Sequence, residues 1–446
     1  MSALKIQRIL RPLLLPFSLL YSLGMVMREH LFASGVFRSW QAPVPVISVG
    51  NISWGGTGKT PLCNWLLKWA ALHRYTPAVL TRGYGAKPER LPYVVSPNSM
   101  AEVAGDEPLL LAKRNKHATV VVDPVRRRAG KWACKNAGAN LLLLDDGFQH
   151  MAVQRDLNLV LLTPDDLRGD WNATHPGGPW REGQVALKRA DAFLIKCHPE
   201  KFREMRPEMK SRLSEYGSPV FNFYMGATSV RQVSTQNREP GFGGEKYILI
   251  TGVGSPEQVV DTAKDLIGYG PKEHLSYPDH HMYTKKDVTD ILRAMRRHGC
   301  KFVLCTGKDA VKLGPLAGGE FWELEFNVYF GPAAGSRLSF DTWLETRWDS
   351  FISSEKRAEK KHNDDGEPAV KAPPAADDPI AAYGDEDDDL LDMMSGDPMD
   401  ALEIPDVEIA QKKKESSASE EPVKSTDDDL IERVNKELYE QEKKNK

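Results

Sequence analysis

Cysteine is scarce in this sequence and follows no pattern. Of 446 residues only five are cysteine, an odd number without a CxxC pair: Cys63, Cys134, Cys197, Cys300 and Cys305. This absence excludes a disulfide framework and a zinc or redox motif of the usual spacing. It is typical of a reducing cytosolic compartment, and a chain of this length buries a core without disulfides.

Long apolar runs are also lacking. One leucine-rich stretch, residues 12–27, is uncharged over 16 residues, whereas about 20 residues are needed to span a bilayer. The basic and acidic residues at 28–30 stand where a signal peptide would have small residues for cleavage. We therefore expect residues 1–35 to form a retained helix on the surface of an anionic membrane, in contact with its lipids. The alternative is a helix packed on the domain core.

Charge is unevenly divided along the chain. The net charge is -3, but residues 355–446 hold 28 Asp and Glu against 14 Lys and Arg, so the remainder is basic. A basic body suits anionic partners, although nothing indicates nucleic acid. The acidic segment 351–446 has few aromatic residues, and we expect it to be disordered, with an unknown protein as its potential partner. Within it, residues 425–443 have the pattern of a charged helix.

Short apolar runs alternate with helical patterns through most of the chain. Strands are predicted at 44–49, 78–81, 118–122, 140–144, 157–162 and 192–195, with a helix at 62–72. This order predicts an α/β fold, a mostly parallel sheet with helices on both faces, over residues 36–225. Strands at 247–251 and 301–305 with helices at 256–267 and 285–298 predict a smaller α/β domain over 226–350. An irregular, strand-rich stretch, 219–244, joins the two.

A glycine-rich loop follows the first strand and opens a helix. Glycines let backbone N–H groups approach phosphate oxygens, a lysine reaches the terminal phosphates, and a threonine hydroxyl is offered to Mg²⁺. We therefore predict a nucleotide-binding P-loop made by Ser53, Trp54, Gly55, Gly56, Thr57, Gly58, Lys59 and Thr60.

Three further absences narrow the class of nucleotide-binding protein. Ser53 stands where GxxxxGK[ST] has its first glycine, so the tight turn is expected at Gly55 and Gly56. Trp54 occupies the position of the signature lysine of dimeric switch ATPases, which argues against that class. The run 306–309 (TGKD) has its lysine one place too late for a guanine-reading NKxD motif. Guanine specificity is therefore not supported.

Two carboxylates end a buried strand. Four leucines, 141–144, lead into Asp145 and Asp146. Strands of this type place such acids beside a phosphate loop, where one of them holds Mg²⁺ directly or through water. We predict a magnesium site formed by Thr60, Asp145 and Asp146.

Seven short motifs together resemble one family. They are GN at 50–51, GGTGKTP at 55–61, TRGYG at 81–85, GDEP at 105–108, DDGFQH at 145–150, GPWRE at 178–182 and DHH at 279–281. In this combination the chain resembles the tetraacyldisaccharide 4'-kinases, the lipid A 4'-kinases. The resemblance extends from the N-terminal helix to about residue 345 and excludes the acidic tail.

The resemblance implies an activity, a location and a catalytic pair. It implies transfer of a phosphoryl group from ATP, with Mg²⁺, to the 4'-hydroxyl of a membrane-embedded tetraacyldisaccharide 1-phosphate at the cytoplasmic face of the inner membrane. Asp106 corresponds to the general base and His280 to its partner, with His281 as the adjacent alternative. A sugar hydroxyl is a poor nucleophile, so a carboxylate must accept its proton. Lys59 and Asp146 are the other expected catalytic residues.

The resemblance also implies a set of substrate-binding residues, whose individual roles stay open: Asn51, Arg82, Glu107, Arg126, Gln149, His150, Arg181 and Glu182. The arginine fork matches phosphate oxygens, although a surface ion pair is the alternative for each arginine. Two positions depart from the family pattern, Gly307 in place of an acidic residue and Trp180 in place of a leucine. A kinase of a soluble small molecule and a membrane-tethered nucleotide-binding scaffold are the rival functions.

Overall fold

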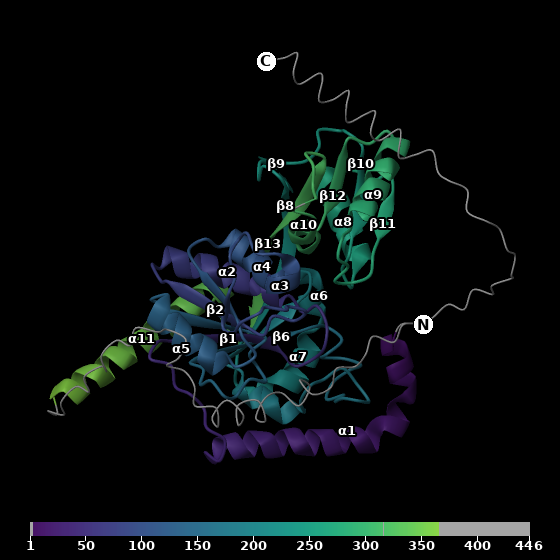
Figure 1. Ribbon diagram of the computed structural model, residues 1–446. Helices are drawn as coiled ribbons and strands as arrows, with labels where there is room; N and C mark the ends of the chain where they lie inside the picture. The colour runs from purple at the N-terminus through teal and green to yellow at the C-terminus, as the bar shows by residue number, and fades with distance from the viewer. Residues whose placement is uncertain (1–2, 315, 365–446) are drawn as a thin grey trace, which may run out of the picture. The chain divides into compact units, whose positions relative to one another are not determined.

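One mostly parallel sheet organises the described part of the chain (Figure 1). The computed structural model describes residues 3–314 and 316–364. The strand order is β11-β10-β12-β13-β8-β7-β6-β1-β5-β2-β4-β3, with β9 paired to β8. Only the pairs β13–β8, β8–β9 and β3–β4 are antiparallel among these strands. The predicted α/β fold class is confirmed.

The core lobe contains the predicted nucleotide-binding strands. Its strands are β1 (Val46–Asn51), β2 (Pro77–Thr81), β3 (Tyr93–Val94), β4 (Thr119–Val122), β5 (Leu141–Asp145), β6 (Leu157–Leu162) and β7 (Ala192–Lys196). Its helices are α2 (Lys59–Leu72), α3 (Ala101–Ala104), α4 (Asp106–Arg114), α5 (Arg126–Asn136), α6 (Pro199–Glu204) and α7 (Arg206–Leu213), with short 3-10 turns at Gln184–Arg189 and Ser214–Tyr216.

Alternation along the strands places helices on both faces of the sheet. Leu141 and Leu143 of β5 belong to a core cluster with residues of α2 and α4. Leu142 and Leu144 point the other way and pack with α5. Because both faces are covered, the central strands are buried at every position and mostly apolar, which is why nearly continuous apolar runs marked them in the sequence.

Two long antiparallel strands connect the core lobe to a second lobe. β8 (Val220–Gln232) and β13 (Phe321–Ala334) pair along most of their length. Beyond them the same sheet continues into the second lobe, made of β9 (Arg238–Glu239), β10 (Tyr247–Thr251), α8 (Pro256–Ile267), β11 (His274–Ser276), α9 (Lys285–Arg297), β12 (Phe302–Cys305) and α10 (Gly307–Leu313). The predicted boundary at 225/226 therefore falls inside β8.

The last described helix returns to the core lobe. α11 (Phe340–Asp364) buries Phe340, Leu344 and Trp348 in the same cluster as α2, and the Trp348 indole donates a hydrogen bond of 2.9 Å to the Tyr75 hydroxyl. The predicted tail boundary at 350/351 thus lies within a helix, and residues 340–350 pack on the core lobe. The rest of the predicted acidic tail, including residues 425–443, lies outside the described residues.

The N-terminal helix α1 (Ala3–Ala33) presents polar groups to the core lobe. Ser18 is buried and donates to the Thr174 carbonyl at 3.0 Å, and Arg8 pairs with Asp170 at 2.7 Å. Near the other end of the helix, Glu29 pairs with Arg189 at 3.1 Å. One face of α1 therefore packs on the core lobe, as the alternative interpretation of the sequence expected.

The opposite face of α1 is apolar and exposed. The exposed side chains are Ile9, Leu10, Leu13, Leu15, Phe17, Leu19, Leu20, Leu23, Val26 and Met27. The segment Gln7–Ala33 has 27 residues and is long and apolar enough to cross a membrane by length and composition alone. This helical segment is longer than the uncharged run that the sequence marked.

Candidate active site

The phosphate loop begins where β1 ends and leads directly into α2. Gly58 precedes the helix with a φ of 96°, and a Cβ there would lie 3.0 Å from the Phe223 ring, so only glycine fits without strain. The Lys59 ammonium group donates to Asn51 Oδ1 at 3.1 Å and lies 3.4 Å from Asp146 Oδ1. The loop lysine is thereby aimed at the carboxyl edge of the sheet.

Ser53 and Trp180, which depart from the usual motifs, meet at a single buried carboxylate. The Ser53 hydroxyl donates to Asp166 Oδ2 at 3.1 Å, and the Trp180 indole donates to Asp166 Oδ1 at 2.9 Å. A backbone bridge also joins Ser53 to Trp180. The first turn of the phosphate loop is thus held by the segment that carries Arg181.

Trp54 is partly exposed at the same place. The Arg181 guanidinium lies over the Trp54 ring, 4.4 Å from its centroid, and the Trp54 amide donates to the Pro179 carbonyl at 2.9 Å. A cation over an indole face is an attractive contact. The side chains of Ser53 and Trp54, predicted to bind nucleotide, therefore contact the 166–181 segment, and the Trp54 amide is bonded to that segment as well.

The two adjacent acids at the end of β5 have different surroundings. Asp145 is buried and accepts hydrogen bonds from the Thr81 hydroxyl at 3.3 Å and the Cys63 thiol at 3.7 Å. Burial, with the charges of Glu107 and Asp146, raises the pKa of Asp145 to about 6. Burial acts in the same direction on Asp146, but the cations Lys59 and Arg181 outweigh it and lower the pKa of that carboxyl. Asp146 is therefore the charged partner of the phosphate loop.

The predicted magnesium ligands have suitable chemistry. Thr60 donates to Glu107 Oε2 at 2.5 Å, and Asp146 Oδ1 is buried without a hydrogen-bond partner among the described residues. Hydroxyl and carboxylate oxygens are the donors that Mg²⁺ prefers, and it usually keeps several waters and substrate phosphates as further ligands. The described residues contain no group of three or more His, Cys, Asp or Glu side chains placed to hold a metal.

The predicted catalytic pair comes together across the two lobes. Asp106 is the first residue of α4, and its Oδ2 lies 3.0 Å from Nδ1 of His280, which belongs to the loop after β11 and has a φ of 60°. His281 turns away and pairs with Asp287 at 3.3 Å. Of the two candidate histidines, His280 is the one that contacts Asp106.

Electrostatics in this pair favours the charged forms. Burial would raise the pKa of Asp106, but the hydrogen bond from His280 and the charge of Lys312 prevail and lower it. The Asp106 hydrogen bond raises the pKa of His280 above its usual value, against an opposing effect of burial. Asp106 is therefore ionised near neutral pH, as a proton acceptor must be.

Several predicted substrate-binding residues gather beside Asp146. The Arg181 guanidinium donates to Asp146 Oδ2 at 2.8 Å, and the Gln149 amide donates to the Asn51 carbonyl at 3.0 Å. Arg126 is buried, so its interpretation as a surface ion pair is wrong; burial and the neighbouring charge of Arg82 lower its pKa to about 10.

The predicted substrate-binding residues His150 and Glu182 differ in whether their side chains already have partners. His150 is buried, and burial together with the charge of Arg126 lowers its pKa well below the usual value, so it is neutral. Its Nε2 has no hydrogen-bond partner among the described residues, which leaves it available to a ligand. Both oxygens of Glu182 instead accept hydrogen bonds from Arg189, at 2.7 and 2.8 Å. The Glu182 carboxylate is thus committed to a structural pair.

Apart from His280, sequence reasoning missed the second-lobe residues that contact the site. Lys308 of α10 pairs with Glu107, and Lys312 of the same helix lies 3.4 Å from Asp106 Oδ2. These residues are about 200 positions apart in the chain, so no local pattern connects them. Asp166 and Cys63 also had no motif that marked them, and Thr81 was marked only as the first residue of the TRGYG motif.

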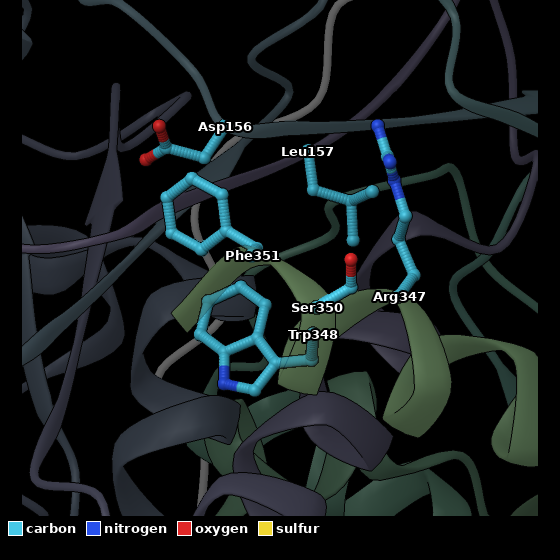
Figure 2. A pocket seen from close by; sticks show the side chains of 6 residues that line it. All are labelled: Asp156, Leu157, Arg347, Trp348, Ser350 and Phe351. Atoms are coloured by element: carbon cyan, nitrogen blue, oxygen red, sulfur yellow. The ribbon is translucent and has the colours of Figure 1, made fainter. Parts of the chain in front are cut away.

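A hollow among the described residues lies away from this site. Figure 2 shows it lined by Asp156, Leu157, Arg347, Trp348, Ser350 and Phe351. Leu157 begins β6, which runs parallel to β1, whereas the phosphate loop follows the end of β1. The hollow is therefore at the opposite edge of the sheet from the phosphate loop.

Comparison with known proteins decides the family. The family model described as tetraacyldisaccharide-1-P 4'-kinase matches residues 10–345. The tetraacyldisaccharide 4'-kinase of Nitratidesulfovibrio vulgaris is 48% identical over 343 residues, covering 77% of this chain and 96% of the relative. This chain belongs to the tetraacyldisaccharide 4'-kinase family. A second relative of that name, from Oleidesulfovibrio alaskensis, is 43% identical over 356 residues and is covered to 98%.

A solved structure of the family supports the fold. The apo form of LpxK from Aquifex aeolicus in complex with ATP aligns with a TM-score of 0.58 at 30% identity, over 72% of this chain and 95% of that chain. The family resemblance predicted from the seven motifs is thereby confirmed. The family match ends before the acidic tail, as the sequence indicated.

Proposed function

We propose that this tetraacyldisaccharide 4'-kinase family member transfers the γ-phosphoryl group of ATP to the 4'-hydroxyl of a tetraacyldisaccharide 1-phosphate. One arrangement carries the proposal. Glu107, the neighbour of the base Asp106, accepts a hydrogen bond from Thr60, which directly follows the loop lysine. A proton acceptor and a phosphate-binding loop are thus joined through adjacent residues.

Asp106 is the proposed general base. As the oxygen of the acceptor hydroxyl forms a bond to the γ-phosphorus, the proton of that hydroxyl passes to the Asp106 carboxylate. The bond between the γ-phosphorus and the oxygen that bridges it to the β-phosphorus breaks, and ADP leaves. His280 holds Asp106 by its Oδ2 atom at 3.0 Å. Its positive charge, favoured by the raised pKa, keeps the carboxylate ionised until the proton arrives.

Lys59 and Arg181 are proposed to stabilise the charge that develops on the phosphoryl oxygens. Both cations contact Asp146, so they are held in place before the nucleotide binds. Such preorganised charges cost no reorganisation during the reaction. Thr60 and Asp146 would hold Mg²⁺, which when bound neutralises phosphate charge and orients the terminal phosphates.

Arg82, Arg126 and His150 are proposed to bind the phosphate of the acceptor. Arg126 is a buried guanidinium whose Nε lacks a hydrogen-bond partner among the described residues, and His150 nearby offers a neutral imidazole. Buried donors without partners are costly unless a ligand satisfies them. An anionic group that accepts these hydrogen bonds would satisfy both side chains.

We also propose that α1 holds the enzyme at the membrane surface, at the cytoplasmic face of the inner membrane. Its polar face is bound to the core lobe at both ends, while its apolar face is exposed. A helix that is fastened along its length to a water-soluble domain lies in the interface more readily than across the bilayer. The segment 174–181 contacts α1 and carries Arg181, so the membrane surface would lie beside the site.

The decisive experiment uses ATP labelled in the γ-phosphate. The purified full-length protein is incubated with Mg²⁺ and a purified tetraacyldisaccharide 1-phosphate in detergent, and the products are separated by thin-layer chromatography. We expect a labelled glycolipid that Asp106→Asn does not form at a comparable rate. Label on soluble small molecules alone would favour the rival soluble kinase, and nucleotide binding without lipid-dependent ATP consumption would favour the scaffold.

A further inference from the structure

Lys312 carries a fully buried charge for which the mechanism above gives no role. Its side chain is 0% exposed, and its ammonium group has no hydrogen-bond partner among the described residues. Its nearest charged neighbours are Asp106 Oδ2 at 3.4 Å and Asp309 Oδ1 at 3.8 Å. Burying an ammonium group is costly, and removing one partner of a buried ion pair is strongly destabilising because the other charge is left uncompensated. A lysine in this position therefore has to be explained by what it contacts.

Asp309 does not explain it, because that carboxylate has other partners. Asp309 accepts hydrogen bonds from the Thr306 hydroxyl at 2.7 Å, the Tyr283 hydroxyl at 3.1 Å and the Gly252 amide at 3.1 Å. These bonds join the start of α10 to the end of β10. The shorter of the two Lys312 contacts is the one that leaves the second lobe and reaches Asp106.

Both cations beside Asp106 lie on the same oxygen. His280 and Lys312 each contact Oδ2, at 3.0 and 3.4 Å, and no hydrogen bond or ion pair to Oδ1 is found in the part of the chain that the structure describes. When both contacts are made to Oδ2, the rotation of the Asp106 carboxylate is restricted. Oδ1 then remains free of hydrogen bonds and ion pairs within the described residues and is available to a substrate. Positioning of this kind has a large effect on rate, since a displacement of about 1 Å at a reacting group costs on the order of 100-fold.

We propose that Lys312 is a positioning residue for the general base. Together with His280 it fixes Asp106 through Oδ2 and directs Oδ1 to the acceptor hydroxyl. The proposal rests on the proposed function and deepens it. The carbonyl of Pro278, in the loop that carries His280, lies close to Gly252, whose amide binds Asp309. The Asp309 network thus places both cations as one unit on the second lobe.

The test removes the charge of Lys312 while keeping its length. Lys312→Met and Lys312→Arg are prepared in the full-length enzyme and assayed with ATP and the tetraacyldisaccharide 1-phosphate in detergent. We expect Lys312→Met to lower kcat about 10- to 100-fold with the KM for ATP within about two-fold of wild type, and Lys312→Arg to restore part of the loss. Lys301→Met is the matched control, because Lys301 is an exposed lysine of the same lobe. It should leave kcat unchanged.

A double substitution separates positioning from a structural role. If Lys312 acts through Asp106, then adding Lys312→Met to Asp106→Asn should not lower the residual rate further. The proposal would be overturned if the double variant showed the product of the two single losses in kcat. It would also be overturned by an unchanged kcat in Lys312→Met, or by a defect confined to the KM for ATP. Thermal unfolding reports whether the variants fold. If Lys312→Met does not fold, the cycle is run with Lys312→Arg, whose displaced charge should lower kcat only when Asp106 is present.

The wild-type enzyme separates this proposal from the one on which it rests. Wild-type protein that labels no glycolipid refutes the proposed function whatever Lys312 does. Wild-type protein that labels the glycolipid, together with a Lys312→Met variant of normal kcat, refutes only the positioning role.

Discussion

The exposed face of α1 allows a quantitative test of membrane attachment. Leu13 and Leu20 are 77% and 67% exposed, and neither side chain makes a polar contact with the core lobe. Leu→Ala removes three carbon atoms at about 0.8 kcal/mol for each buried CH₂. Scaled by about 70% exposure, each substitution should cost about 1.5–2 kcal/mol of membrane transfer. Alanine favours helices, so α1 itself should persist.

The double variant Leu13→Ala/Leu20→Ala should therefore bind membranes much more weakly. A combined loss of about 3–4 kcal/mol lowers the partition coefficient on the order of 100- to 1000-fold. The measurement is cosedimentation with vesicles of mixed neutral and anionic phospholipids over a range of lipid concentrations. Circular dichroism and thermal unfolding should match the wild-type protein, because both side chains face away from the core lobe.

Leu72 provides the control. It is 82% exposed at the end of α2, so Leu72→Ala removes the same atoms from an equally exposed site outside α1. Its partition coefficient should equal that of wild type. Unchanged vesicle binding in the double variant, or an equal loss in Leu72→Ala, would refute the assignment of α1 as the membrane contact.

Two further predictions concern the catalytic site. Lys59→Ala should lower turnover on the order of 100- to 1000-fold, because it removes a charge preorganised for the phosphoryl oxygens. The unfolding temperature should change by no more than a few degrees. Near-native turnover would contradict the assignment of residues 53–60 as the phosphate loop. The raised pKa of His280 predicts a stabilising contribution that is fully present below about pH 6.5, the usual value, and is lost as pH rises through the higher folded value. In urea unfolding, the difference in unfolding free energy between wild type and His280→Gln should therefore be larger at pH 5.5 than at pH 9. A difference in unfolding free energy that grows with pH would contradict the pairing of His280 with Asp106.

The sequence predicted those elements whose residue pattern depends only on neighbouring positions in the chain. The run 157–162 coincides with β6, and 247–251 coincides with β10, because strands buried on both faces are mostly apolar along their whole length. β13 was not predicted, since its second half is only partly buried and contains Gly331 and Pro332, which obscure the period of a strand. The sequence marked the joining stretch 219–244 only as irregular and strand-rich, so the predicted boundary at 225/226 falls inside β8.

The site itself was readable only in part. The phosphate loop and the paired acids form local motifs, so their residues could be named. The choice between His280 and His281 depends on a backbone turn, and the approach of Lys312 to Asp106 depends on how α10 meets α4. Contacts between segments so distant in the chain follow from tertiary packing, which a single sequence does not reveal.

The route of the chain through β8 and β13 makes the second lobe an insertion within a hairpin. Met225 of β8 pairs with Val328 of β13, and α11 then rejoins the core lobe. Joining these two residues by a tight turn would excise the lobe and leave the strands and helices of the nucleotide-binding half in one shortened polypeptide. Such a miniature protein would keep the proposed phosphate loop and lose His280 and Lys312, the proposed partners of the base, so it offers a way to study nucleotide binding apart from phosphoryl transfer.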